Sequence, residues 1–260
     1  MPTAAACTTA CTTACTADVF RPFGFASVPV AAPAAAVAAP ALVQPDAGMD
    51  LRLAQLLCAR VCHDLIGAAG AIQTGLELLA EDGTDQADIF DLIGLSGRQL
   101  NRRLAFYRLA FGMSGQSRDS RALGEARRLA EGFLEGGRVT LRWEVDAAAL
   151  GDGRLGDHET RLLLCAILVA AEGLPRGGEL VVSLRCSGTA PRLAVRAGGA
   201  TAAIPDAVAI ALSGGAGLDA VTARTVPAYY LGLQARSRGG AIEVRAEEAA
   251  FSLRITVPAS

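Results

Sequence analysis

The residues of this sequence best suited to group-transfer chemistry are His63 and Asp64, which are neighbours within a long helical pattern. Apolar residues recur at helical spacing from residue 50 to residue 80, and His63 projects to the side opposite this apolar stripe. An exposed imidazole can act as a nucleophile, and an adjacent carboxylate can hydrogen-bond to one ring nitrogen while the other stays free to attack. An ordinary exposed histidine would occupy the same position, so the surrounding residues decide between the two interpretations.

The neighbours of His63 on its own side of the helix favour the chemical interpretation. Gly67 and Gly70 follow it by one and two turns, although a glycine inside a helix costs roughly 1 kcal/mol relative to alanine. The glycines would clear the surface around the imidazole for the close approach of a partner. Arg60 precedes His63 by about one turn, where a guanidinium could hold a phosphate or the acidic pocket of a partner.

The composition excludes several other reaction classes. All 24 basic residues are arginine, so the chain has no lysine for a phosphate-binding loop, a Schiff base or a kinase strand. His63 and His158 are the only histidines, which is too few for a three-histidine zinc site, and we assign His158 to a solvated surface. A net charge of −2 gives no electrostatic footprint for nucleic acid or an anionic membrane, so we expect neither partner.

The seven cysteines are an odd number, which argues for a reducing compartment, and we expect a cytoplasmic protein. Cys58 and Cys62 are assigned to packing rather than to a metal site, and we expect no bound metal. Three further cysteines lie in a threonine-rich repeat at the start of the chain, where a low-complexity segment is favoured over a metal site: Cys7, Cys11 and Cys15.

The sequence divides into three regions. Residues 1–48 are predicted to be a disordered low-complexity leader, whose prolines interrupt every apolar run. Residues 49–116 contain two predicted helices, 50–80 and 87–113, which form an antiparallel hairpin and should pair with a second copy into a four-helix bundle. Residues 117–260 alternate helices with antiparallel-type strands, so the fold class is α+β with one sheet covered by helices on one face. Helices are expected at 122–136, 158–174 and 229–238, and strands at 139–145, 179–186, 191–197, 241–246 and 251–257.

The segment CARVCHDLIGAAGAIQTGLELL, residues 58–79, resembles the phosphoacceptor helix of the ChpT-type histidine phosphotransferases of alphaproteobacterial phosphorelays, and more distantly the H-box of sensor histidine kinases. The family pattern HDLISPxGAIxNG becomes HDLIGAAGAIQTG here, with changes at Gly67, Ala68 and Thr74. The resemblance implies that His63 is the phosphoacceptor and that Asp64 orients the ring and accepts its proton. It also implies a receiver-binding surface made of Arg60, Ile66, Gly67, Gly70 and Thr74.

The region 117–260 resembles the ATP-binding domain of histidine kinases in the order of its elements, but the nucleotide site looks degenerate. Cys165 and Val169 stand where kinases carry asparagines, the second of which holds magnesium, and VRAGGA (195–200) contains no aspartate at the position of the adenine loop. The glycine-rich SGGAG (213–217) is taken as a set of vestigial turns. The resemblance therefore implies an ATPase-like α/β sandwich without a cofactor of its own, so the partner receiver domain would supply Mg²⁺.

These observations predict a homodimeric histidine phosphotransferase that shuttles a phosphoryl group through His63 in a two-component phosphorelay. Its partners would be the receiver domain of a hybrid histidine kinase and the receiver domains of response regulators. A non-catalytic dimeric scaffold that docks response regulators fits the same fold and stays open as an alternative. An ATP-dependent histidine kinase is a less favoured alternative, because the asparagines and the aspartate of a working nucleotide site are missing.

Overall fold

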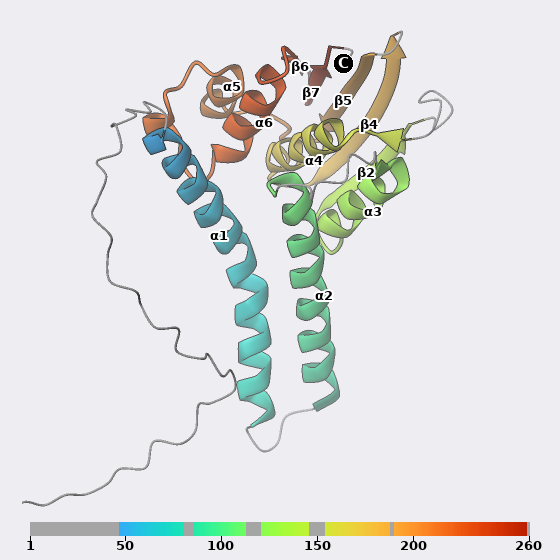
Figure 1. Cartoon of the computed structure of the whole chain (residues 1–260). Coiled ribbons are helices and arrows are strands. Elements are labelled where there is room, and N and C mark those ends of the chain that lie inside the picture. Colours follow the sequence, from blue (N-terminus) through green and yellow to red (C-terminus); the bar gives the residue numbers. More distant parts are fainter. Residues whose placement is uncertain (1–46, 81–85, 113–120, 146–153, 188–189, 259–260) are drawn as a thin grey trace, which may run out of the picture. The chain divides into compact units, whose positions relative to one another are not determined.

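Two long antiparallel helices form the hairpin, and the first of them carries His63 and Asp64 (Figure 1). The computed structural model describes residues 47–80, 86–112, 121–145, 154–187 and 190–258. Helix α1 (Ala47–Leu79) and helix α2 (Gln86–Ala110) begin and end within three residues of the predicted bounds. The predicted leader, with its three cysteines, lies outside the described residues except for its last two positions. No helix in the described ranges is both long and apolar enough to cross a membrane.

The two helices of the hairpin approach closely because α1 carries a glycine at their contact. A Cβ atom on Gly75 would lie 2.6 Å from Cγ1 of Ile93 on α2, so only glycine allows this spacing. Ala68 of α1 and Ile89 of α2 are buried in the same interface. Part of the periodic apolar set therefore packs between the helices, while Leu76, Leu92 and Leu104 of the same set are exposed.

Five strands form the main sheet, in the order β2-β4-β5-β7-β6. They are β2 (Val139–Glu144), β4 (Gly178–Ser187), β5 (Ala190–Gly198), β6 (Ala241–Glu247) and β7 (Ala250–Thr256). All neighbours are antiparallel except β2 and β4, which are parallel. The expectation of antiparallel strands was wrong for this pair. A parallel pair needs a crossover connection, and helix α4 (Asp157–Glu172) lies in the connection between β2 and β4.

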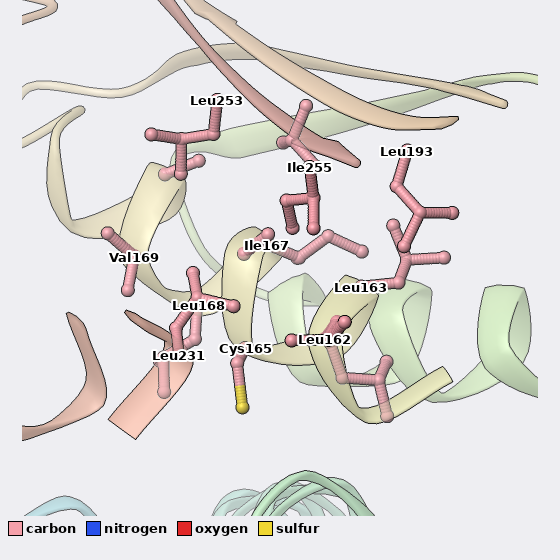
Figure 2. Packing of buried hydrophobic residues seen from close by; sticks show 14 of the residues in the cluster. Leu162, Leu163, Cys165, Ile167, Leu168, Val169, Leu193, Leu231, Leu253 and Ile255 are labelled. Carbon is pink, nitrogen blue, oxygen red and sulfur yellow. The ribbon is translucent and has the colours of Figure 1, made fainter. Parts of the chain in front are cut away.

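Helix α4 lies at the centre of the core. Its residues facing the strands meet side chains of β5 and β7, as Figure 2 shows for Leu163 and Ile167 beside Leu193 and Ile255. Cys165 points away from the strands, toward the end of α2, and its thiol donates to the Ala110 carbonyl at 3.4 Å. The remaining helices of this region are α3 (Leu123–Leu134), α5 (Asp206–Ser213), the 3-10 helix η2 (Leu218–Ala220) and α6 (Val226–Arg236), and two-residue strands β1 (Arg121–Ala122) and β3 (Arg154–Leu155) pair separately.

Helices α1 and α2 pack against the sheet region rather than standing apart from it. The core that contains α4 also contains Phe106 and Leu109 of α2, and Leu53 and Leu57 of α1 pack against it. Residues 44–260 accordingly form one unit, which spans the boundary drawn at 116 from the sequence.

The assignment of His158 to a solvated surface was wrong. His158 is buried, with 6% of its surface exposed, because it begins a helix that is covered on nearly every side. Burial, together with the positive charge of Arg238, lowers the pKa of this imidazole. The segment 213–217 is a turn region as expected, except that Ser213 ends α5, and Gly214, at φ 77°, caps this helix in the left-handed conformation.

Candidate functional site

The side chain of His63 stands out from α1 with 83% of its surface exposed. Its Nδ1 lies 3.0 Å from Oδ1 of Asp64. A carboxylate can only accept a hydrogen bond, so this contact requires the proton of a neutral ring to be on Nδ1. Nε2 then carries a lone pair and faces solvent. The exposure of His63 and its contact with Asp64 are as the sequence predicted, while the nucleophilic role of Nε2 stays a prediction.

Asp64 is much less exposed than the histidine that it contacts, with 10% of its side chain accessible. Its second oxygen, Oδ2, accepts a hydrogen bond from Nε of Arg60 at 2.9 Å and another from the hydroxyl of Tyr107. Burial alone would raise the pKa of Asp64, but the hydrogen bonds from Tyr107 and His63 and the charge of Arg60 outweigh it and lower the pKa. The carboxylate is therefore ionised at neutral pH.

Tyr107 comes from α2 and is a member of the site that the sequence analysis did not identify. It is 3% exposed, and burial next to the negative charge of Asp64 raises the pKa of its hydroxyl. One helical turn earlier, Nη1 of Arg103 donates to the backbone carbonyl of Asp64 at 2.8 Å. A buried tyrosine on an apolar helix face needs a hydrogen-bond partner for its hydroxyl, so the sequence could have indicated that Tyr107 has one. The helical spacing does not identify that partner as Asp64.

Arg60 lies between two carboxylates rather than reaching freely into solvent. Its guanidinium forms ion pairs with Asp64 and with Glu172, the last residue of α4, and 14% of its side chain is exposed. Burial disfavours the charged form, but the two carboxylates more than compensate and raise the pKa of Arg60. Burial raises the pKa of Glu172 to about 7, although the charge of Arg60 opposes this shift. The pair joins α1 to the sheet region.

The other residues predicted to bind a receiver share the exposed side of α1 with His63. Ile66 has 69% of its surface exposed, and Gly67, Gly70 and Thr74 are exposed as well. A Cβ atom on Gly67 or Gly70 would meet nothing within 4 Å, in contrast to Gly75. Packing within this chain therefore does not explain these two glycines, whereas the close approach of a partner would.

A cavity of about 1010 Å³ opens beside the imidazole, between α1 and the sheet region. Arg60, His63 and Asp64 line it from one side, and Val169 and Glu172 of α4 line it from the other. Val169 therefore presents an apolar side chain where a kinase asparagine was expected. Within the described ranges, no cluster of three or more histidine, cysteine, aspartate or glutamate residues could hold a metal ion.

Cys58 and Cys62 are both exposed, so their assignment to packing was wrong. Apolar and sulfur-containing residues at the margin of a helical stripe often stay at the surface, because the surface of a folded protein is itself largely apolar. Cys165, in contrast, is fully buried, and burial raises the pKa of its thiol to about 12. Its hydrogen bond to the end of α2 gives it a structural role in this chain.

The fold and the site together point to a class of protein: an exposed histidine paired with a carboxylate on a helical hairpin, joined to an α+β region, fits histidine-based phosphotransfer. Comparisons with known proteins give the family. A family model described as the histidine phosphotransferase C-terminal domain matches residues 123–250. The protein phosphotransferase ChpT of Brucella abortus (strain 2308) is 36% identical over 204 residues, which cover 78% of this chain and 95% of that protein.

A solved structure agrees with this assignment. The 1.7 Å structure of a bacterial phosphotransferase superimposes with a TM-score of 0.68 at 32% identity, over 79% of this chain and 96% of that one. The chain belongs to the ChpT-type histidine phosphotransferase family.

Proposed function

We propose that His63 is the phosphoacceptor through which this phosphotransferase passes a phosphoryl group between the aspartates of two receiver domains. The observation that carries the proposal is the contact between Nδ1 of His63 and Asp64, which leaves an unprotonated Nε2 exposed on α1. Membership of the phosphotransferase family supports the reaction class.

The transfer step needs few groups of this chain. The lone pair of Nε2 attacks the phosphorus of a receiver's aspartyl phosphate, and the N–P bond forms as the P–O bond to the aspartate breaks. The electron pair of that bond returns to the receiver's carboxylate. The ring becomes positively charged and keeps its proton on Nδ1, where the ionised Asp64 stabilises it or accepts the proton. The reverse sequence passes the group to a second receiver. Two points stay predictions: this chain holds no cofactor, and the receiver brings the Mg²⁺.

The receiver would dock on the exposed side of α1, over Ile66, Gly67, Gly70 and Thr74. Arg60 stays at the edge of this surface, but its ion pairs with Asp64 and Glu172 favour a role in holding Asp64. We therefore propose that Arg60 contributes to transfer by holding Asp64 rather than by contacting the receiver directly. A hybrid-kinase receiver as donor, response regulators as acceptors and a cytoplasmic location stay predictions.

We also propose that the hairpin pairs with a second copy into a four-helix bundle. The hairpin of the single chain exposes several large apolar side chains, and exposed apolar surface of this kind often marks an interface. Their exposed fractions lie between 41% and 60% for Leu76, Phe90, Leu92, Leu95 and Leu104. A partner hairpin would cover these side chains.

The test is transfer of label from a phosphorylated receiver domain to the purified full-length chain. The wild-type chain should acquire acid-labile label, and His63→Gln should not, while light scattering should give the mass of a dimer for both. His158→Gln removes the other histidine and should keep the label, because that ring is buried away from solvent. Label that persists in His63→Gln would assign the acceptor elsewhere, and a chain that binds receivers without any label would be the scaffold.

A further inference from the structure

Among the residues that the structure describes, Asp64 alone holds the His63 ring by a hydrogen bond. The imidazole is 83% exposed, and the carboxylate is the hydrogen-bond partner that the structure gives it. A side chain so exposed gains no fixed orientation from packing, and a free neutral histidine favours the tautomer with its proton on Nε2. That tautomer has no lone pair at the exposed nitrogen. Whatever fixes the Asp64 carboxylate therefore also fixes the reactive form of the ring.

The Asp64 carboxylate is fixed by groups from other parts of the fold. Oδ2 accepts hydrogen bonds from Tyr107 of α2 and from Arg60, so Oδ1 is the oxygen left for Nδ1 of His63. Arg60 is itself held by Glu172 of α4. The carboxylate thus contacts α2 directly and α4 through one intermediate side chain.

Tyr107 is the most rigid of these groups. Its ring is 3% exposed and stacks on Phe111 with centroids 5.4 Å apart and planes 17° from parallel. Phe106 and Phe133 contact it edge-on, each with a centroid distance of 5.8 Å. An aromatic ring packed on three sides has little freedom, so its hydroxyl is aimed at a fixed point.

We propose that Tyr107 is a positioning residue for phosphotransfer: its hydroxyl binds Oδ2 of Asp64, which directs Oδ1 to Nδ1 of His63 and keeps the lone pair on the exposed Nε2. Tyr107 does not contact the receiver or the phosphoryl group in this mechanism. The inference rests on His63 being the acceptor, but its structural half can be measured without any transfer reaction.

The test compares Tyr107→Phe with Tyr229→Phe in the full-length chain. Both variants lose one phenolic hydroxyl and keep the ring, and Tyr229, on α6, is not a hydrogen-bond partner of the Asp64 carboxylate. Nitrogen-15 NMR at about pH 8.5, where histidine rings are neutral, reports which nitrogen carries the proton, and His63→Gln assigns the signals. Single-turnover transfer from a phosphorylated receiver is measured on the same samples at several receiver concentrations.

In the wild-type chain and in Tyr229→Phe, Nδ1 of His63 should be protonated and Nε2 should not. Tyr107→Phe should move both signals toward the average of the two tautomers and lower the maximal transfer rate by about tenfold, the loss expected for a hydrogen bond to a charged group. The receiver concentration at half-maximal rate should stay unchanged, because docking is untouched.

An unchanged tautomer in a folded Tyr107→Phe would overturn the proposal, and so would a loss confined to receiver affinity. Asp64→Asn provides a second variant, because an amide that donates to Nδ1 should invert the tautomer. If that variant leaves the tautomer unchanged, Asp64 does not orient the ring and the proposal also fails. If the wild-type chain takes no label at all, the acceptor assignment fails, while the NMR result still decides whether Tyr107 positions the ring.

Discussion

Replacing Glu172 by glutamine should make the protein more stable at high pH, even though it removes one partner of an ion pair. Glu172 ends α4 with 26% of its side chain exposed, and it contacts Arg60. Burial raises the pKa of this carboxyl from 4.5 to about 7. Arg60 and Arg224 oppose the shift, and the negative charge of Asp64 adds to it.

The magnitude follows from the two pKa values. At about 1.4 kcal/mol for each pH unit, the change from 4.5 to about 7 corresponds to about 3 kcal/mol. Because the folded chain binds this proton more tightly than the unfolded chain, the stabilisation is fully present below pH 4.5. It is lost as the pH rises through about 7. Glutamine does not titrate, so the variant should gain about 3 kcal/mol relative to the wild type between about pH 4.5 and about pH 8.5.

Denaturant unfolding at a fixed protein concentration and four pH values between about 5 and 8.5 measures this difference. Glu135→Gln is the matched control, because Glu135 is 57% exposed and pairs with Arg102 at the surface. Its effect should stay below about 1 kcal/mol at every pH. If the advantage of Glu172→Gln is flat with pH, or if the wild type gains on the variant as the pH rises, the ion pair with Arg60 outweighs burial and the reasoning is refuted.

Two further predictions concern the nucleotide site and the docking surface. Titration calorimetry with Mg-ATP should show no binding up to about 1 mM, because Val169 offers no magnesium ligand. A dissociation constant of about 1 mM corresponds to a binding free energy of about −4 kcal/mol. A micromolar dissociation constant, or labelling from ATP alone, would contradict this prediction. Gly70→Arg should keep a native circular dichroism spectrum but block transfer from receivers, whereas Gly75→Arg should destabilise the hairpin by more than about 1 kcal/mol, since its side chain would collide with α2. Gly124→Arg, the same change in open space on α3, should leave both properties intact, and native transfer by Gly70→Arg would show that receivers dock elsewhere.

The elements that depend on local pattern were predictable from the sequence. The hairpin helices were placed within three residues, because their apolar residues repeat every three or four positions over many turns. The contact between His63 and Asp64 was also predictable, since it joins adjacent residues. Helix α5 was missed, because its eight residues are too few to show a period, and the glycines after it drew attention to turns instead.

The contacts that complete the site were not predictable, because each depends on how one element lies on another. Tyr107 is 43 positions from Asp64, and Arg60 meets Glu172 only because α4 packs beside α1. The periodicity shows that Tyr107 faces inward, but it carries no information on the side chain it will meet. His158 was misplaced for the same reason: its polar neighbours suggested a surface, while the packing around the start of α4 covers it.

The residues of α4 at the predicted degenerate nucleotide site make structural contacts in this chain. In the resemblance to kinases, Cys165 and Val169 replace asparagines that serve a bound nucleotide. Here the Cys165 thiol donates a hydrogen bond to the Ala110 carbonyl at the end of α2. Other residues of α4 pack in the centre of the core. Glu172, at the end of the same helix, holds Arg60 and through it Asp64. Helix α4 therefore has structural contacts that need no nucleotide: they anchor the hairpin and brace the carboxylate beside His63.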